Sequence, residues 1–514
     1  METDTILILD FGGQYCHLIG RRIREMGVYS EIVPYDISRK DIISLKKTLG
    51  IKGIILSGGP LSIYSTDSPK MNREILEMGL PILGICYGHQ LLAHYLGGTA
   101  KKASRPEYGN SIANISMKTG VLHGLKSKEK VWMSHGDSVT SLPKGIDITA
   151  SSTNCKIAAY EDGKRRIFGV QWHPEVMHTK NGSMVISNFI FRVCKCRKTW
   201  NAERNASEYV SKLKNEVGSG NAIMALSGGI DSTAAALIAS KALGKRLTAV
   251  FVDTGLMRED EPEKISKIAK SLKINLVTVD ASGTFFSNLG KVSDPEKKRK
   301  IIGREFIRVF EAQAKKVKAE FLIQGTIYPD RIESGHSMNS SVIKTHHNVG
   351  GIPSDSKFKG IIEPLKNLYK DEVRSLAKNM GIPAEIVYRQ PFPGPGLAVR
   401  ILGKVTREKA VKLKKADAIV CSELEKIPIG KRPWQYFAVL TGSRSTGVKG
   451  DSRAYGDVIA VRAVESKEAM TASFSRIPFG TLERISGRIT AEIPSVVRVV
   501  YDITNKPPST IEWE

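Results

Sequence analysis

Short apolar runs alternate with helical patterns along most of this 514-residue chain. Residues 5–10 and 81–85 are strand-like runs, and residues 16–26 carry apolar side chains at helical spacing. In a second series the apolar run 222–226 precedes a helical stretch of small residues at 232–242. Such alternation is typical of parallel sheets covered by helices, so it predicts α/β domains.

Polar and chain-breaking segments divide the chain into three parts. Residues 195–220 are polar and separate the two α/β series, and Pro391–Gly396 (Pro-Phe-Pro-Gly-Pro-Gly) ends the second. The rest of the chain mixes helical stretches with β-like runs, which predicts a smaller α+β domain. We therefore expect domains at 1–198, 199–393 and 394–514.

Composition excludes several classes of protein. Hydrophobic residues make up 41% and charged residues 25% of the chain, as in ordinary globular proteins. No run approaches the ~20 apolar residues that a membrane-spanning helix needs. The first residues, Met-Glu-Thr-Asp-Thr, lack the basic segment of a signal peptide, and six cysteines are too few for a disulfide framework. We expect a cytoplasmic protein with no membrane partner.

The formal net charge of +25 suggests anionic partners, and nucleic acid is the first class to weigh. The basic excess is spread evenly, however, and the longest basic cluster is only residues 297–300 (Lys-Lys-Arg-Lys). A nucleic-acid-binding tail would show as a block of like charge. We favour a generally basic surface and expect no nucleic-acid partner, while a basic nucleic-acid-binding protein stays open as an alternative.

A cysteine lies between two glycines at a strand-to-helix junction. The segment Gly84–Gly88 (Gly-Ile-Cys-Tyr-Gly) has the spacing of a nucleophile elbow, with cysteine in place of serine. The turn would put Cys86 at a helix N-terminus, where the helix dipole favours a thiolate. A lone cysteine in such a run is more often a core residue. Here, however, His173 can act as its base and Glu175 can orient the imidazole.

Five segments of this first part resemble class I glutamine amidotransferases. They are residues 10–14 (Asp-Phe-Gly-Gly-Gln), 56–60 (Leu-Ser-Gly-Gly-Pro), 84–90, 134–137 (Ser-His-Gly-Asp) and 171–175. In that family the cysteine attacks the side-chain amide of glutamine, ammonia leaves, and water releases glutamate from the thioester. The resemblance implies an oxyanion hole of backbone amides near Gly59 and Tyr87. It also implies a glutamine-binding set of Gln90, Ser134, His135, Gly136 and Asp137.

A second glycine turn, residues 225–233 (Ala-Leu-Ser-Gly-Gly-Ile-Asp-Ser-Thr), joins a strand-like run to a helix. Amides at a glycine turn and a helix N-terminus form a cradle for an anion. Hydroxyl groups come from Ser227, Ser232 and Thr233. Asp231 can hold a metal ion that neutralises phosphate charge. A plain turn with a capping serine is the alternative that a bare Ser-Gly-Gly would favour.

The segment Ser227–Thr233 resembles the PP-loop of ATP pyrophosphatases, which bind the β- and γ-phosphates of ATP and cleave it between the α- and β-phosphates. Thr233 stands where the family usually has serine, and it keeps the hydroxyl. The resemblance implies an ATP-binding set of Ser227, Gly228, Gly229, Ile230, Asp231, Ser232, Thr233, Val252 and Asp253. The implied cofactor is Mg²⁺ bound with ATP, with Asp231 as its ligand. We expect neither zinc nor a redox cofactor.

Five further segments resemble the GMP synthetase family and occur in the family's order. They are residues 325–334, 344–351, 391–396, 450–453 and 506–514. The resemblance implies that XMP, ATP and glutamine become GMP, AMP, pyrophosphate and glutamate through an adenylated XMP. The residues that it assigns to XMP are Arg299, Asp451, Lys506 and Glu512, and those that it assigns to a lid over the nucleotide are Lys344, His346 and His347.

The resemblance also implies a fold of two doubly wound α/β domains, a class I amidotransferase and a PP-loop domain, followed by a smaller α+β domain through which the chain dimerises. Two rival functions remain: another PP-loop amidotransferase, which makes NAD or an amino-acid amide, and a nucleic-acid-binding PP-loop protein. The first rival would lack the motif at 506–514. The complete Cys86, His173 and Glu175 set argues against a protein with inactive sites.

Overall fold

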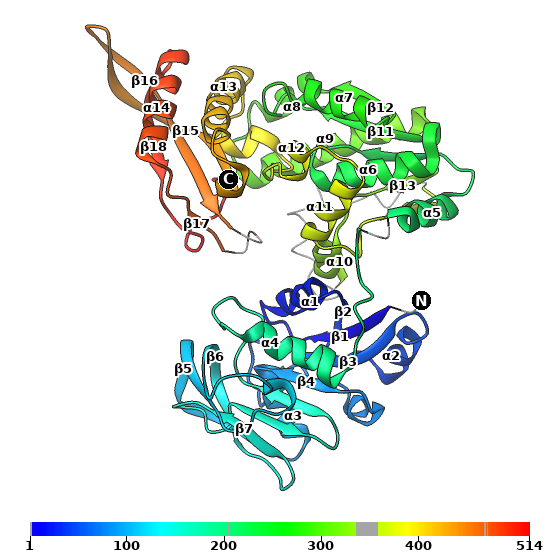
Figure 1. Cartoon of the computed structure of the whole chain (residues 1–514). Coiled ribbons are helices and arrows are strands. Elements are labelled where there is room, and N and C mark those ends of the chain that lie inside the picture. The colour runs from blue at the N-terminus through cyan, green and yellow to red at the C-terminus, as the bar shows by residue number, and fades with distance from the viewer. Residues whose placement is uncertain (1–2, 204–205, 336–357, 467–468, 470) are drawn as a thin grey trace. The chain divides into compact units, whose positions relative to one another are not determined.

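The computed structural model describes residues 3–203, 206–335, 358–466, 469 and 471–514. The chain forms two compact units, Met1–Asn201 and Ala202–Glu514 (Figure 1). The boundary between the units lies close to the division expected after residue 198. Residues on both sides of position 393 belong to the second unit, so the expected domain limits stay predictions.

The first unit is built on a nine-stranded mixed sheet with the order β2-β1-β3-β4-β9-β8-β7-β5-β6. Strands β2, β1, β3, β4 and β9 are parallel, and the remaining pairs are antiparallel. The strands are β1 (Asp4–Asp10), β2 (Tyr29–Pro34), β3 (Gly50–Leu56), β4 (Ile82–Ile85), β5 (Thr99–Ile115), β6 (Lys128–Ser141), β7 (Asp147–Ser151), β8 (Ala159–Asp162) and β9 (Ile167–Val170). The helices are α1 (Cys16–Glu25), α2 (Arg39–Leu45), α3 (Tyr87–Tyr95) and α4 (Gly182–Ser187).

The central strands of this sheet are apolar on both faces. The run Ile6–Leu9 of β1 is fully buried, as expected for a parallel strand with helices on both sides. Helix α1 buries Ile19 and Ile23 on one face, which is the spacing that its sequence predicts. The long strands β5 and β6 are different, because in β5 buried positions are separated by exposed ones. Sequence analysis did not predict this pair.

The second unit begins with a five-stranded parallel sheet of order β12-β11-β10-β13-β14. Its strands are β10 (Ala222–Ala225), β11 (Leu247–Asp253), β12 (Leu276–Asp280), β13 (Phe321–Ile323) and β14 (Gly360–Ile362). Its helices are α5 (Ala206–Val217), α6 (Ile230–Leu243), α7 (Glu261–Ser271), α8 (Ser282–Leu289), α9 (Pro295–Lys316), α10 (Tyr328–Gly335), α11 (Lys370–Asn379) and α12 (Ala384–Val387). The predicted α/β alternation is therefore confirmed here.

The C-terminal part of this unit adds a sheet in which β16 pairs with β15, β17 and β18 (Figure 1). Its elements are α13 (Arg407–Leu424), β15 (Gln435–Lys449), β16 (Ser452–Glu465), β17 (Ser473–Phe474), α14 (Phe479–Glu492) and β18 (Val496–Asp502). One hydrophobic core extends from Val250 of the parallel sheet to Leu413 of α13 and Ile485 of α14. In the described ranges no helix is long and apolar enough to cross a bilayer.

Candidate active sites

Cys86 lies in the turn between β4 and α3, and its backbone φ is 54°. A positive φ is strained for a residue with a side chain and persists only where the surroundings impose it. Here the amide of Cys86 donates to the carbonyl of Val170 at 2.9 Å, and the amide of Gly88 donates to that of Ser57 at 3.2 Å. A Cβ on Gly88 would lie 2.6 Å from the Cβ of Leu56, so the helix can approach β3 this closely only with glycine at that position.

The turn places the thiol beside the predicted base. Cys86 and His173 line the same cavity and interact electrostatically. The Nδ1 atom of the His173 ring lies 2.7 Å from Glu175 Oε1. All three side chains are buried. Because Nδ1 donates to Glu175, Nε2 is the nitrogen left to exchange a proton with the thiol.

The charge around His173 favours its protonated form. Burial by itself lowers the pKa of His173, but the Glu175 carboxylate and the negative charge of Cys86 outweigh burial and raise that pKa well above its usual value. An imidazole that readily accepts a proton is the base that a cysteine nucleophile needs. The structure therefore brings together the nucleophile, base and orienting carboxylate expected from the sequence.

A cavity of about 490 Å³ opens beside the thiol. Its lining contains Cys86 and His173 and the whole predicted oxyanion and glutamine set: Gly59, Tyr87, Gln90, Ser134, His135, Gly136 and Asp137. Helix α3 begins at Tyr87, so the amide of Tyr87 has no acceptor within its own helix and is available to an oxyanion. Gln90 Nε2 donates to the carbonyl of Asp137 at 2.8 Å and to Gln171 Oε1 at 3.2 Å, so this side chain ties α3 to the cavity wall.

The second predicted site lies between β10 and α6. Gly228 has a φ of 75°, and a Cβ there would lie 2.7 Å from Ile265 Cδ1, so the turn needs glycine. Gly229 caps α6, and its carbonyl accepts a hydrogen bond from Thr233 Oγ1 at 2.8 Å. Ser227 Oγ lies 2.9 Å from Ser232 Oγ. The turn thus gathers hydroxyls at the N-terminus of a helix, where an anion is favoured.

Asp231 is the candidate metal ligand in this turn. One of its carboxylate oxygens forms an ion pair with Lys370, and the other, Oδ1, is buried and has no hydrogen-bond partner among the described residues. Mg²⁺ is commonly held by one or two carboxylates together with phosphate oxygens and water. A single carboxylate with one unsatisfied oxygen fits that pattern. Within the described ranges no three His, Cys, Asp or Glu side chains cluster as metal ligands.

A cavity of about 500 Å³ adjoins the turn. Of the predicted ATP-binding residues, those that line it are Ser227, Gly229, Ile230, Asp231 and Val252. Gly228, Ser232, Thr233 and Asp253 lie outside the lining, and Asp253 Oδ1 accepts from the amide of Gly255 at 2.8 Å. The apolar side chains of Ile302, Phe306 and Phe310 also line the cavity, as suits a nucleotide base.

Three cationic residues in the same lining were missed by sequence analysis: Lys370, Arg374 and Arg389. They suit the phosphates of a nucleotide. Arg389 forms an ion pair with the buried Glu261 and donates to the carbonyl of Gly228 at 3.0 Å, so it braces the turn. Lys370 carried a usable signal, because a lysine at the first position of α11 opposes the helix dipole.

Of the four residues assigned to XMP by resemblance, Arg299 lies on a helix and Asp451 in a turn between two strands. Arg299 lies on α9 and bonds Glu296 at 2.5 Å. Its neighbour Lys298 is fully buried and forms an ion pair with Glu514, so the basic cluster at 297–300 is not simply a solvated helix face. Asp451 is exposed at the turn between β15 and β16.

The other two lie near the C-terminus. Lys506 Nζ donates to the carbonyl of Ala469 at 2.8 Å, and both carboxylate oxygens of Glu512 accept from Arg400, at 2.9 and 2.8 Å. In the part of the chain that the structure describes, none of the four predicted XMP residues bonds another. The predicted lid residues Lys344, His346 and His347 lie outside the described residues.

Three family models match consecutive parts of the chain. They are "Glutamine amidotransferase class-I" over residues 7–193, "NAD synthase" over 203–307 and "GMP synthase C terminal domain" over 422–513. GMP synthases (glutamine-hydrolyzing) are similar to this chain over 100% of both lengths. The enzyme of Clostridium botulinum is 49% identical, that of Geobacillus kaustophilus 50% and that of Caldicellulosiruptor saccharolyticus 49%. At this identity over the full length, the chain belongs to the glutamine-hydrolysing GMP synthase family.

Proposed function

We propose that this enzyme converts XMP to GMP, with glutamine as the nitrogen donor and ATP as the activating nucleotide. The observation that carries the proposal is the 49–50% identity over the whole length to GMP synthases. Two features of the structure support it. The first unit has a cavity beside an activated cysteine, and the second has a cationic cavity beside a phosphate-type glycine turn.

The first site would release ammonia from glutamine. The Cys86 thiolate attacks the amide carbon, and the oxyanion that forms is stabilised by backbone amides that include that of Tyr87. His173, protonated at Nε2 and held at Nδ1 by Glu175, gives its proton to the departing nitrogen. Water then enters, His173 takes a proton from it, and hydrolysis of the thioester releases glutamate and restores Cys86.

The second site would activate XMP. The carbonyl oxygen at the position to be aminated attacks the α-phosphorus of ATP, and pyrophosphate leaves. Ammonia then adds to the adenylated carbon, and AMP departs. The turn at Ser227–Thr233 binds the leaving pyrophosphate, while Lys370 and Arg389 neutralise its charge. We propose that Asp231 holds Mg²⁺ with ATP, where the ion supplies charge stabilisation for the phosphates.

The first prediction separates the two half-reactions. Cys86→Ala removes the nucleophile of the glutamine site and leaves the second unit intact, so glutamine-dependent GMP formation should fall by at least about a thousandfold. GMP formation from added ammonium should stay within about twofold of the wild type, because ammonia from the solution replaces the ammonia that the first site would release. Both rates are measured with XMP, ATP and Mg²⁺. Loss of both activities in a folded protein would contradict the proposed division.

The second prediction concerns the nucleotide site. Asp231→Asn keeps the size of the side chain but removes the charge that pairs with Lys370 and would hold Mg²⁺. GMP formation should fall by about a hundredfold or more with either nitrogen source, since both routes need adenylated XMP. Alkylation of Cys86 by iodoacetamide should proceed at the wild-type rate. A variant that still forms GMP at the wild-type rate from ammonium would exclude this role of Asp231.

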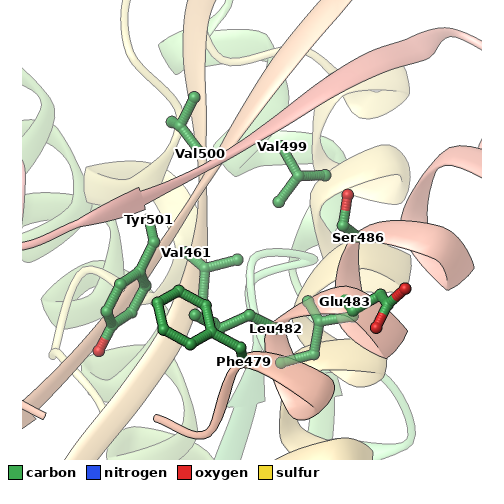
Figure 2. A pocket seen from close by; sticks show the side chains of 9 residues that line it. Val461, Phe479, Leu482, Glu483, Ser486, Val499, Val500 and Tyr501 are labelled. Carbon is green, nitrogen blue, oxygen red and sulfur yellow. The ribbon is translucent and has the colours of Figure 1, made fainter. Parts of the chain in front are cut away.

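We propose that the enzyme is a homodimer formed through its C-terminal part. A cleft of about 410 Å³ lies between α14 and β18, and Figure 2 shows the Phe479 ring beside Tyr501 and Leu482 at this cleft. Phe479 is 89% exposed, and Val500 and Ile503 are also exposed apolar residues of this region. Exposed apolar side chains gathered at one place are a common sign of a protein–protein interface. A second copy of the chain would cover them.

The third prediction tests this interface. In size-exclusion chromatography with light scattering, the wild type should have twice the chain mass of 56.4 kDa. Phe479→Asp should have the mass of a monomer, because it places a charge in an apolar contact. The matched control is Ile43→Asp on α2, which is exposed in the other unit and should leave the dimer intact. A wild-type monomer, or a Phe479→Asp dimer, would be the contrary result.

We further propose that the enzyme works in the cytoplasm. Its six cysteines are all free thiols in the structure, which is the state that a reducing compartment maintains.

A further inference from the structure

A carboxylate that the mechanism does not use is buried behind the glutamine cavity. Glu107 lies on β5 and is 7% exposed. One of its oxygens, Oε1, accepts from Ser111 Oγ at 3.0 Å. The other, Oε2, accepts from Ser152 Oγ at 2.8 Å and faces His135 Nε2 at 3.3 Å. Three polar side chains from different parts of the sheet therefore converge on this one carboxylate.

The ring of His135 connects this carboxylate to the backbone of the cavity wall. Its Nδ1 lies 2.8 Å from the carbonyl oxygen of Asp137, which can only accept, so Nδ1 is the donor there. Its Nε2 lies 3.3 Å from Glu107 Oε2 on the opposite side of the ring. His135 is therefore held from both sides.

His135 belongs to the wall of the glutamine cavity, and that wall contacts the catalytic groups. The carbonyl of Ser134 accepts a hydrogen bond from the thiol of Cys86 at 3.5 Å. The carbonyl of Asp137 accepts from both His135 Nδ1 and Gln90 Nε2, each at 2.8 Å. His135 and Glu107 are also direct cross-strand partners in the β5–β6 ladder. Glu107 is thus joined through one side chain to the backbone that lines the cavity.

That connection matters because, in the part of the chain that the structure describes, β6 is the last strand of its sheet. The β5–β6 pairing is also interrupted between Lys102 and Glu107 on the β5 side. Because the β5–β6 pairing gives weaker support at this place, side-chain contacts contribute more to the position of the cavity wall. The contact of Glu107 Oε2 with His135 Nε2 supplies such support at the level of the cavity.

We propose that Glu107 is a positioning residue for glutamine hydrolysis, which acts through His135 to hold the segment Ser134–Asp137 in its binding geometry. The inference rests on the proposed function of the first site and adds a residue to it. Glu107 itself does not line the cavity. Its removal should therefore act mainly on the binding of glutamine, through a wall that is no longer fixed, and less on the chemical step at Cys86.

The test compares Glu107→Ala with a matched control in the same sheet. Glu129 on β6 is a carboxylate that is similarly buried and also accepts hydrogen bonds, from Lys126 N at 2.7 Å and from Asn181 Nδ2 at 2.9 Å, but neither of these partners lines the cavity. Each full-length variant is assayed for glutamine hydrolysis with XMP, ATP and Mg²⁺ present. GMP formation from ammonium and the melting temperature are measured in parallel.

Glu107→Ala should raise KM for glutamine by about tenfold or more, with a smaller change in kcat, since the wall that binds glutamine loses the contact that fixes it. GMP formation from ammonium should stay at the wild-type rate. Glu107→Gln, which keeps the size and one acceptor oxygen, should recover much of the KM. Glu129→Ala should leave the KM for glutamine unchanged even where it lowers the melting temperature.

An unchanged KM in folded Glu107→Ala would overturn the inference, and so would an equal rise in KM in Glu129→Ala. If Glu107→Ala does not fold, Glu107→Asp replaces it, because the shorter side chain keeps the charge but withdraws the carboxylate from His135. The same rise in KM is then expected, and an unchanged KM again overturns the inference. Failure of the proposed function itself is distinguishable, since the wild type would then not hydrolyse glutamine.

Discussion

The strained backbone at Cys86 is the constraint on which the chemistry of the first unit depends. A φ of 54° turns the chain sharply from β4 into α3, and it persists because the flanking amides bond β9 and the loop after β3. Strain of this kind costs about 1–3 kcal/mol, which the buried parallel sheet offsets. This turn places the Cys86 thiol at a helix N-terminus, beside His173 and open to a cavity. Without that turn, His173 and Glu175 would have no nucleophile within reach.

The second unit has the same local arrangement of a strand, a glycine turn and a helix, but its chemistry is different. A parallel strand ends, glycines make the turn, and a helix begins with its amides exposed, but here the turn carries hydroxyls and Asp231 instead of a thiol. Side chains distant in sequence complete the site. Lys370 pairs with Asp231, and Arg389 braces Gly228 while Glu261 holds the arginine. The anion-binding turn is therefore local, whereas the cations that complete it come from the tertiary fold.

This contrast explains what could be predicted from the sequence. The strands and the glycine turns were predictable because apolar runs and glycine spacing are local properties, and the residues of the Cys86 site follow from short motifs. Glu107 and Arg389 were not, because each meets its partner far along the chain and neither lies in a motif. The β5–β6 pair was missed as well, since strands with many polar residues lack the continuous apolar run of a buried strand. The roles of the XMP and lid residues stay predictions.

The central claim is that nitrogen released at Cys86 becomes the amino group of GMP. The most direct test supplies glutamine labelled with ¹⁵N at its side-chain amide, together with XMP, ATP, Mg²⁺ and an equal concentration of unlabelled ammonium. Mass spectrometry of the GMP then gives the fraction of its new nitrogen that is labelled. The account predicts GMP that carries predominantly the glutamine label. Unlabelled GMP, with the ¹⁵N recovered as free ammonium, would contradict it.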